Sequence, residues 1–339
     1  MMPAVHPSSI TKIVLLWVVA SLLLASCGVQ SGPTPQTNVP ENASPTVAPQ
    51  VTPSATATLP ADTPTPAPTA TEVLVSPTPA PTIPVPTEQI RILILGSDIR
   101  EDNSFRTDVI MLLTVNPQEG TATVLSFPRD LYVYLPFGRF ERINTVQYFG
   151  FKTMADTLES NFGVRPQYYV MTNFAGFLNI IDSLGGIDVQ VAAEMTDQCD
   201  LPHRDVVTGA CTVRPGTVRM DGQYALWYVR SRKSTSDFDR QRRAQEVMQG
   251  IFARLLTLDA LARAPEIYRQ FSGSVETNLD LRTIVSLGGV VPSLTRSGNI
   301  RRYAITIKEA TPFIGAEGAS LLYPNLGAIQ TIVQEALTP

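Results

Sequence analysis

The sequence predicts an α/β fold, in which helices cover a β-sheet. Short apolar runs that are typical of buried strands stand at residues 90–95, 109–115 and 121–127. A helix-like stretch, 173–184, precedes a further strand-like run at 187–191. An alternation of strands and helices is typical of a sheet that helices cover.

The predicted helices carry signals at their ends. Thr172 or Asn173 can cap the first helix, which Gly185 and Gly186 end after Leu184. The signals therefore place this helix between two strands.

Two more helices are predicted close together in the second half of the chain. Asp221 can cap one that runs towards Arg230 and Arg232. The other begins near Asp237 or Asp239 and runs to about residue 258, with a buried apolar stripe at Val247, Met248, Ile251, Phe252, Leu255 and Leu256.

The first residues resemble the signal peptide of a bacterial lipoprotein. Lys12 precedes an apolar run, 13–24, that is short for a membrane span and ends in the lipobox-like Leu24-Ala25-Ser26-Cys27. The resemblance predicts removal of residues 1–26 and a lipid on Cys27, which would anchor the protein to the outer face of the cytoplasmic membrane. An uncleaved anchor helix is the alternative, and it also leaves the rest of the chain outside the cytoplasm.

The chain after the lipobox divides into a linker and one domain. Residues 27–88 are rich in Pro, Thr, Ser and Ala, with almost no charged or aromatic side chains, so they cannot bury a core and favour extended polyproline II. Residues 89–339 have the length and apolar content of a single domain.

Two cysteines in the domain predict a disulfide. Cys199 and Cys211 lie close together in a segment with Pro and Gly. Outside the cytoplasm the environment is oxidising, so two such cysteines form a disulfide. On the chain-entropy model, closing so short a loop stabilises the fold by roughly 2–3 kcal/mol. The zinc alternative is weak, because only His203 lies between the two cysteines and a tetrahedral site needs four ligands.

Four short clusters combine arginine and aspartate with almost no lysine. Guanidinium groups grip phosphate oxygens in pairs, and carboxylates hold a hard cation such as Mg²⁺ that bridges those oxygens. The clusters are G-S-D-I-R at 96–100, R-T-D at 106–108, P-R-D at 128–130 and R-S-R-K-S-T-S-D-F-D-R-Q-R-R at 230–243. They therefore predict a site for a pyrophosphate and its cation.

The predicted elements bring these clusters together. The first and third follow directly on predicted strands and the second precedes one, so one edge of the sheet could gather all three. In the fourth, Arg240 and Arg243 are three residues apart and share a face on the first turn of a helix. The partial positive charge of that helix N-terminus also favours an anion.

Seven blocks in this order resemble the LytR-CpsA-Psr glycopolymer transferases. The blocks are G-S-D-I-R after a strand, R-T-D before the next, S-F-P-R-D at 126–130, R-I-N at 142–144, F-L-N-I-I-D-S-L-G-G-I-D-V at 177–189, D-G-Q-Y-A-L-W-Y-V-R-S-R at 221–232 and D-F-D-R at 237–240. The resemblance implies a single α/β domain with a central mixed sheet and helices on both faces. It also implies transfer of a glycan phosphate from a polyprenyl-pyrophosphate-linked donor to a cell-wall glycan acceptor, usually a peptidoglycan sugar hydroxyl.

The same resemblance assigns the site residues. It makes Asp98 and Asp108 the ligands of Mg²⁺ or Mn²⁺, and Asp237 the group that orients or deprotonates the acceptor hydroxyl. The anion contacts are Arg100, Arg106, Arg129, Arg230, Arg232 and Arg240, to which the helix face adds Arg243. Of these, Asp98, Asp108, Arg129, Arg230, Arg232, Asp237 and Arg240 form the expected catalytic set.

The chain departs from the family pattern in two places. The family often has Gln directly after the helix arginine, where this chain has Ala244 and then Gln245. Many members are anchored by a transmembrane helix rather than a lipid. Taken singly, the aspartates could cap strand ends, Arg129 and Asp130 could form a surface ion pair, and the 230–243 run could be a solvated helix face.

Several classes of function are excluded. His203 is the only histidine after Cys27, which argues against a Ser-His-Asp hydrolase, and no G-x-x-x-x-G-K-[ST] stretch supports a P-loop nucleotidase. An exported domain in a chain of net charge −4 has no route to nucleic acid. A tethered binder of lipid-linked or wall glycans remains the alternative from another class, and pyrophosphatase activity would use the same residues.

Overall fold

A computed structural model describes residues 78–99, 105–232, 236–257, 271–294, 298–315 and 318–338, together with 266, 269 and 296. The predicted signal peptide, Cys27 and most of the predicted linker lie outside the described residues, as does Arg100. Among the described residues, no helix combines the length and apolar character that a membrane crossing requires.

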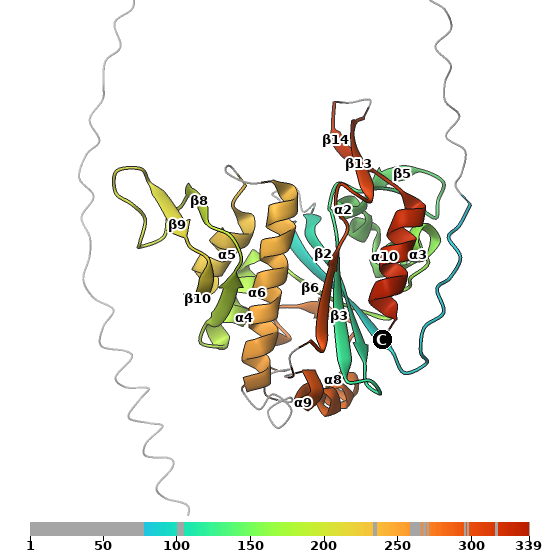
Figure 1. Ribbon diagram of the computed structural model, residues 1–339, viewed down its shortest axis with the longest axis horizontal. Helices are drawn as coiled ribbons and strands as arrows, with labels where there is room; N and C mark the ends of the chain where they lie inside the picture. The colour runs from blue at the N-terminus through green and yellow to red at the C-terminus, as the bar shows by residue number, and fades with distance from the viewer. Residues whose placement is uncertain are drawn as a thin grey trace, which may run out of the picture. The chain divides into compact units, whose positions relative to one another are not determined.

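The centre of the domain is a six-stranded mixed sheet (Figure 1). Its strands, in spatial order, are β11 (Glu276–Thr277), β6 (Tyr168–Thr172), β1 (Ile90–Ile99), β2 (Phe105–Asn116), β3 (Thr121–Phe127) and β12 (Ile300–Ala304). β1, β2 and β3 run antiparallel to one another, whereas β6 is parallel to β1 and β12 is parallel to β3. The predicted mixed sheet is confirmed.

Helices cover both faces of this sheet, as predicted (Figure 1). α3 (Phe151–Phe162) and α10 (Leu326–Leu337) lie on one face. α4 (Phe174–Ser183) and α6 (Asp237–Thr257) lie on the other, with α5 (Gly222–Arg230) packed between them. Alternate strand residues supply the two cores: Leu112 faces the first pair of helices, while Met111 packs near Ala244 of α6.

Shorter elements surround these layers. They are β4 (Tyr132–Tyr134), β5 (Phe140–Arg142), α2 (Ile143–Val146), η1 (Gln147–Phe149), β7 (Ile187–Val191), β8 (Met195–Gln198), β9 (Ala210–Val213), β10 (Gly216–Met220), α8 (Leu281–Leu287), η2 (Gly288–Val290), α9 (Val291–Leu294), β13 (Ala310–Ile314) and β14 (Ser320–Pro324).

The helix caps follow the sequence signals. The Asn173 side chain accepts a hydrogen bond from Gly176 N at 2.9 Å and begins α4. Asp221 caps α5 in the same way, by accepting from Tyr224 N at 2.8 Å. After α4 the chain turns at Gly185, which has a φ of 71° that glycine adopts without strain.

The first two strands are longer than their apolar runs predicted. β1 continues to Ile99 rather than ending at Leu95, and β2 already begins at Phe105. Asp98 pairs with Arg106 across this ribbon. The first two arginine-aspartate clusters therefore lie largely within paired strands instead of in loops beside them, because backbone pairing continues where the apolar pattern stops.

Residues 78–85, which composition had assigned to the linker, lie along α3. Ala80 N donates to Ser160 O at 2.7 Å and Ile83 N to Gly163 O at 2.9 Å. Gly163 has a φ of 76°, and a Cβ there would stand 2.3 Å from Pro81 O. Only glycine therefore lets this segment approach the end of the helix so closely.

The β8–β9 hairpin carries a disulfide between Cys199 and Cys211. Both cysteines pack with Leu201 against Tyr224 and Trp227 of α5. Trp227 Nε1 also donates to Gln198 O at 2.8 Å, so the hairpin is fixed to this helix.

Arg243 of α6 is fully buried and ties two helices together. Its Nε donates to Tyr228 O at 2.7 Å, and its Nη2 donates to Ser231 O just beyond the end of α5. Its guanidinium also lies over the Tyr228 ring. The side chain thus holds the end of α5 against α6.

Disrupting the disulfide should destabilise the domain without unfolding it. Replacing both Cys199 and Cys211 by Ser should lower the free energy of unfolding by about 2–3 kcal/mol, because the closed loop is short and its unfolded-state entropy returns. Urea denaturation of the oxidised wild type and the double variant measures this difference. Identical midpoints would show that the hairpin is held by its packing alone.

The buried Arg243 should be required for stability. Arg243→Met should lower the free energy of unfolding by about 2–4 kcal/mol, because two buried carbonyls lose a charged hydrogen-bond donor. Lys152→Met is the matched control, since it removes an exposed cation of α3 and should change stability by less than about 0.5 kcal/mol. Equal effects in thermal unfolding of the two variants would contradict the assigned role of Arg243.

Candidate active site

The site begins at a β-bulge in β2. Gly96 pairs with Val109 while the next residue, Ser97, pairs with Thr107, so Asp108 is the extra residue of the longer strand. A bulge of this kind redirects a side chain and is frequent next to active sites. The strands also approach closely here, since a Cβ on Gly96 would lie 3.1 Å from the Val109 Cβ.

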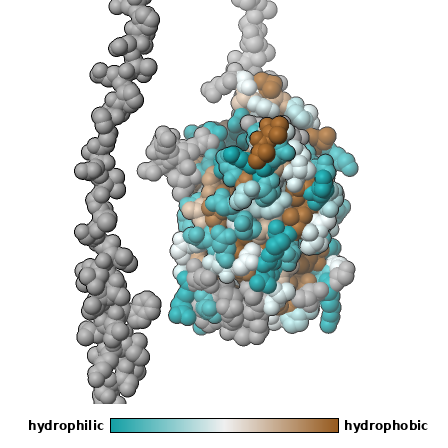
Figure 2. Space-filling view, turned by 90° about the vertical axis from the view of Figure 1, so that its left-hand side faces the viewer, coloured by the Kyte–Doolittle hydropathy of each residue, from teal (hydrophilic) through white to brown (hydrophobic). Residues whose placement is uncertain are grey.

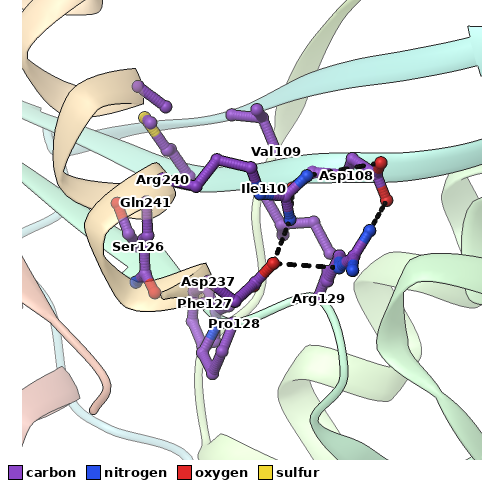
Figure 3. A pocket seen from close by; sticks show the side chains of 12 residues that line it. Asp108, Val109, Ile110, Ser126, Phe127, Pro128, Arg129, Asp237, Arg240 and Gln241 are labelled. Atoms are coloured by element: carbon purple, nitrogen blue, oxygen red, sulfur yellow. Dashed lines mark hydrogen bonds and ion pairs between the residues drawn. The ribbon is translucent and has the colours of Figure 1, made fainter. Parts of the chain in front are cut away.

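Asp108, Arg129, Asp237 and Arg240 form a closed ring of ion pairs, which we call the charged ring (Figure 3). Asp108 binds Arg129 through Oδ1 at 3.1 Å and Arg240 through Oδ2 at 3.3 Å. Asp237 Oδ1 lies 3.3 Å from Arg129 Nε and 2.9 Å from Arg240 Nη2. β2, the segment after β3 and the first turn of α6 each contribute to the ring.

The ring lies at the surface with its arginines more deeply set than its aspartates. The side chains of Arg240 and Arg129 are 8% and 14% exposed, against 26% for Asp108 and 30% for Asp237. Two positive and two negative groups balance one another. An anion that enters the ring would therefore contact guanidinium groups that are already paired with carboxylates. It could replace those carboxylates as their partner.

The charges of the ring shift two pKa values. Burial raises the pKa of Asp108, but the nearby guanidinium groups of Arg129 and Arg240 outweigh it and hold that pKa below its ordinary value. Burial lowers the pKa of Arg129, but the carboxylates of Asp237, Asp108 and Asp130 together raise it. Asp108 is therefore a carboxylate and Arg129 a cation at neutral pH.

A second layer of contacts holds Arg129. Its Nε also lies 3.4 Å from Asp130 Oδ2, and Asp130 is paired through Oδ1 with Arg142 Nε at 3.8 Å. Leu322 N donates to Asp130 O at 2.9 Å. The C-terminal hairpin β13–β14 thus fixes the backbone beside the ring.

Asp98, Arg230 and Arg232, which the sequence also predicts as site residues, lie outside the ring. Asp98 Oδ1 accepts a hydrogen bond from Arg106 N at 2.8 Å. Arg230, at the end of α5, is exposed and lies over the Phe174 ring at 4.3 Å. Arg232 is also exposed, and its charge is close enough to contribute to the lowered pKa of Asp108.

Arg243 does not belong to the site. The sequence predicted an anion contact because Arg243 lies three residues after Arg240. The structure corrects this interpretation, because its guanidinium is completely buried and donates to the carbonyls of Tyr228 and Ser231. Arg100, the remaining predicted anion contact, lies outside the described residues.

The sequence patterns did not identify two residues near the site, Gln241 and Asp197. Gln241 lines the pocket behind the ring, and both atoms of its carboxamide are buried without a hydrogen-bond partner. Its spacing of four from Asp237 places it on the same helix face, which was the available signal. Asp197 Oδ2 accepts from Arg232 N at 3.0 Å, across 35 residues of sequence, and no local pattern predicts such a contact.

The donor set suits a hard cation only together with a phosphate ligand. Among the described residues, no group of three or more His, Cys, Asp or Glu side chains converges on a point. Mg²⁺ is, however, commonly held by one or two carboxylates while phosphates and water complete its six ligands. Asp98 and Asp108, on the neighbouring strands β1 and β2, are two carboxylates of the kind that this mode of binding requires.

Comparison with known proteins identifies a family. A model of the LytR_cpsA_psr family matches residues 65–322. The chain is 32% identical over 197 residues to the polyisoprenyl-teichoic acid–peptidoglycan teichoic acid transferase TagU of Bacillus cereus (strain AH820), a match that covers 57% of this chain and 61% of TagU. It is 31% identical over 209 residues to TagT of Bacillus subtilis (strain 168), covering 60% of this chain and 64% of TagT.

Solved structures resemble the fold as well. The crystal structure of B. subtilis TagV superposes with a TM-score of 0.61 at 26% identity, covering 74% of this chain and 98% of TagV. TagT bound to LIIa-WTA superposes with a TM-score of 0.57 at 25% identity, covering 74% of this chain and 90% of TagT. The chain spans about three-fifths of the length of the TagU and TagT sequences that it matches. The chain belongs to the LytR_cpsA_psr family.

Proposed function

We propose that the protein is an extracytoplasmic phosphotransferase that moves a glycopolymer from a polyprenyl-pyrophosphate carrier to a cell-wall acceptor such as a peptidoglycan sugar hydroxyl. The observation that carries this proposal is the charged ring, in which two deeply set arginines stand paired with replaceable carboxylates. Relatives named as teichoic acid transferases to peptidoglycan support the same chemistry.

The residues divide the work of phosphoryl transfer. The guanidinium groups of Arg129 and Arg240 bind the pyrophosphate oxygens, and the exposed Arg230 and Arg232 extend this contact along the donor. Mg²⁺ or Mn²⁺, held by Asp98 and Asp108, would neutralise charge on those oxygens. Positioning and charge stabilisation supply most of the rate enhancement in such reactions.

Asp237 is the proton acceptor in this scheme. The acceptor hydroxyl oxygen attacks the phosphorus that carries the glycan, its proton passes to Asp237, and the bridging P–O bond breaks. The glycan phosphate is then joined to the acceptor, and polyprenyl phosphate leaves. When the arginines turn to the phosphates, the Asp237 carboxylate is released from its ion pairs with Arg129 and Arg240 and can contact the acceptor hydroxyl.

The proposed placement follows the predicted leader. Cleavage before Cys27 and lipid attachment to its sulfur would anchor the protein to the outer face of the cytoplasmic membrane, where polyprenyl carriers and the wall are both within reach. Labelling with a radioactive fatty acid in cells, compared with Cys27→Ala, tests this placement directly. Unlabelled wild-type protein would contradict it.

The proposed activity is tested by following release of polyprenyl phosphate from a lipid-linked glycan donor. We expect Mg²⁺-dependent release that rises when a cell-wall acceptor is present. Release that is the same with and without the acceptor would instead establish a pyrophosphatase. Tight donor binding with no release under either condition would establish a glycolipid-binding protein.

Removing the proton acceptor should reduce turnover and leave donor binding largely intact. Asp237→Asn should lower kcat by about 10²–10⁴-fold, the usual contribution of a positioned base. Asp239→Asn is the matched control on the same helical turn, because the Asp239 carboxylate lies outside the charged ring and contacts Ser236 and Arg242. An equal loss in both variants, measured as initial rates at saturating donor, would remove Asp237 from this role.

Activity should depend on a divalent cation through Asp98. EDTA should abolish release, and Mg²⁺ or Mn²⁺ should restore it. Asp98→Asn should raise the Mg²⁺ concentration for half-maximal rate at least several-fold, because a neutral amide is a poorer ligand for a hard cation. Asp188→Asn, which alters an exposed carboxylate of β7, should leave the Mg²⁺ requirement unchanged. Full activity in EDTA would exclude the cation from the reaction.

A further inference from the structure

A second hollow lies at the opposite end of α5 from Arg230. It has a volume of about 560 Å³, is open to solvent, and is bordered by the turn after α4, the segment after Cys199 and the first turn of α5. Binding sites for small ligands and sugar units commonly have volumes of this size. None of the residues assigned to phosphoryl transfer lines it.

One wall of this hollow is aromatic. The exposed ring of His203 lies against Tyr224, with their centroids 4.7 Å apart, and Tyr224 lies 5.8 Å from Trp227 behind it. Flat rings on an open surface offer their faces to the C–H side of a sugar ring, and Tyr and His also present polar tips for hydrogen bonding. The wall thus combines the two contacts that a sugar makes.

The polar residues around the aromatic wall suit hydroxyl groups. Asp182 and Asp221 each use Oδ1 to accept from a backbone N–H at 2.8 Å, which fixes the orientation of both carboxylates. Gln223 is exposed beside them and carries both a donor and an acceptor. Hydroxyl groups need such a mixture of acceptors and donors.

The charge of the hollow distinguishes between kinds of glycan. Arg219 lines the hollow, but its guanidinium is already paired with Asp188 at 3.2 Å and donates to Gly185 O. The carboxylates of Asp182 and Asp221 therefore leave the hollow with a net negative character. Uncharged sugar rings fit this surface, whereas a polymer linked by phosphodiesters would be repelled.

The wall is held rigidly. The disulfide between Cys199 and Cys211 lies immediately before the segment that carries His203, and it packs on Tyr224 and Trp227. Figure 2 looks onto the side of the domain where the β8–β9 hairpin lies in Figure 1 and shows this side as largely hydrophilic, with isolated hydrophobic projections. A crosslinked wall beside a polar hollow is preorganised for a ligand.

We propose that this hollow binds the acceptor glycan strand, a few sugar units away from the hydroxyl that reacts. The inference rests on the proposed function and adds a second contact to it. The nine residues of α5 span about 13 Å at 1.5 Å per residue, with Asp221 at the hollow and Arg230, a proposed donor contact, at the other end. A strand lying along this helix would reach both places and present one hydroxyl to Asp237.

Acceptor length is the variable that tests the proposal. Wild-type protein should show a KM for glycan-strand acceptors that falls at least five-fold between a disaccharide and longer oligosaccharides, because only the longer strands reach the hollow. The double variant His203→Ala and Gln223→Ala should lose this gain and keep the disaccharide KM and kcat. Val206→Ala, a change at a fully exposed position of the same loop, is the control and should behave as wild type.

Direct binding provides a second measurement that needs no donor. The sequence contains two tryptophans, and Trp17 lies in the proposed leader, so the fluorescence of the mature protein reports on Trp227 alone. Neutral glycan oligosaccharides should change its fluorescence in a saturable way, and His203→Ala with Gln223→Ala should abolish the change. A tighter response to phosphodiester-linked polymer fragments than to neutral strands would overturn the assignment to the acceptor.

The outcomes separate this inference from the proposed function. Release of polyprenyl phosphate with one KM for all acceptor lengths, and no fluorescence response, would overturn the glycan hollow and leave the transferase standing. Saturable binding of neutral glycans without release under any condition would support the hollow while rejecting the transferase.

Discussion

The site depends on the mutual neutralisation of two arginines and two aspartates at the point where β2, β3 and α6 meet. Neither Arg129 nor Arg240 is well exposed, and a cation at that depth without a partner would be destabilising. Asp108 and Asp237 provide the partners. The bulge in β2 places Asp108 beside the two arginines, and the first turn of α6 places Asp237 there. The backbone therefore brings both carboxylates to the arginines that they neutralise.

This pairing has a consequence for ligand binding. The pyrophosphate of the proposed donor would have to compete with carboxylates that are already in contact with the guanidinium groups, so its net gain in binding free energy would be smaller than with unpaired arginines. In the proposed function, a cation that entered with the phosphates would compensate by pairing with Asp108, one of the two carboxylates that are released. Arginine and aspartate in near-equal numbers are therefore better suited to a metal-bound pyrophosphate than to a bare anion.

The sequence predicted more of the strands and helices than of the contacts in the site. Apolar runs and capping residues such as Asn173 and Asp221 set the strands and helices, because these signals act over a few residues. Strand ends were less accurate, since the pairing of Asp98 with Arg106 continues beyond the apolar run. Asp108, Arg129, Asp237 and Arg240 could be named from the family pattern, but the spacing that implicated Arg243 cannot tell a side chain facing the cleft from one facing a neighbouring helix. The contact of Asp197 with Arg232 depends on tertiary packing alone.

The segment 78–85 along α3 also determines how mechanical load enters the domain. Its backbone is hydrogen-bonded at Ala80 and Ile83 to the end of α3, on the face of the sheet opposite α6. A pulling force applied to the chain before Ala80 would first break these two hydrogen bonds. The core on the α3 side of the sheet would resist it next. The charged ring lies across the sheet from that point of attachment, so tension on the chain before Ala80 would detach the segment before it distorted the arginines.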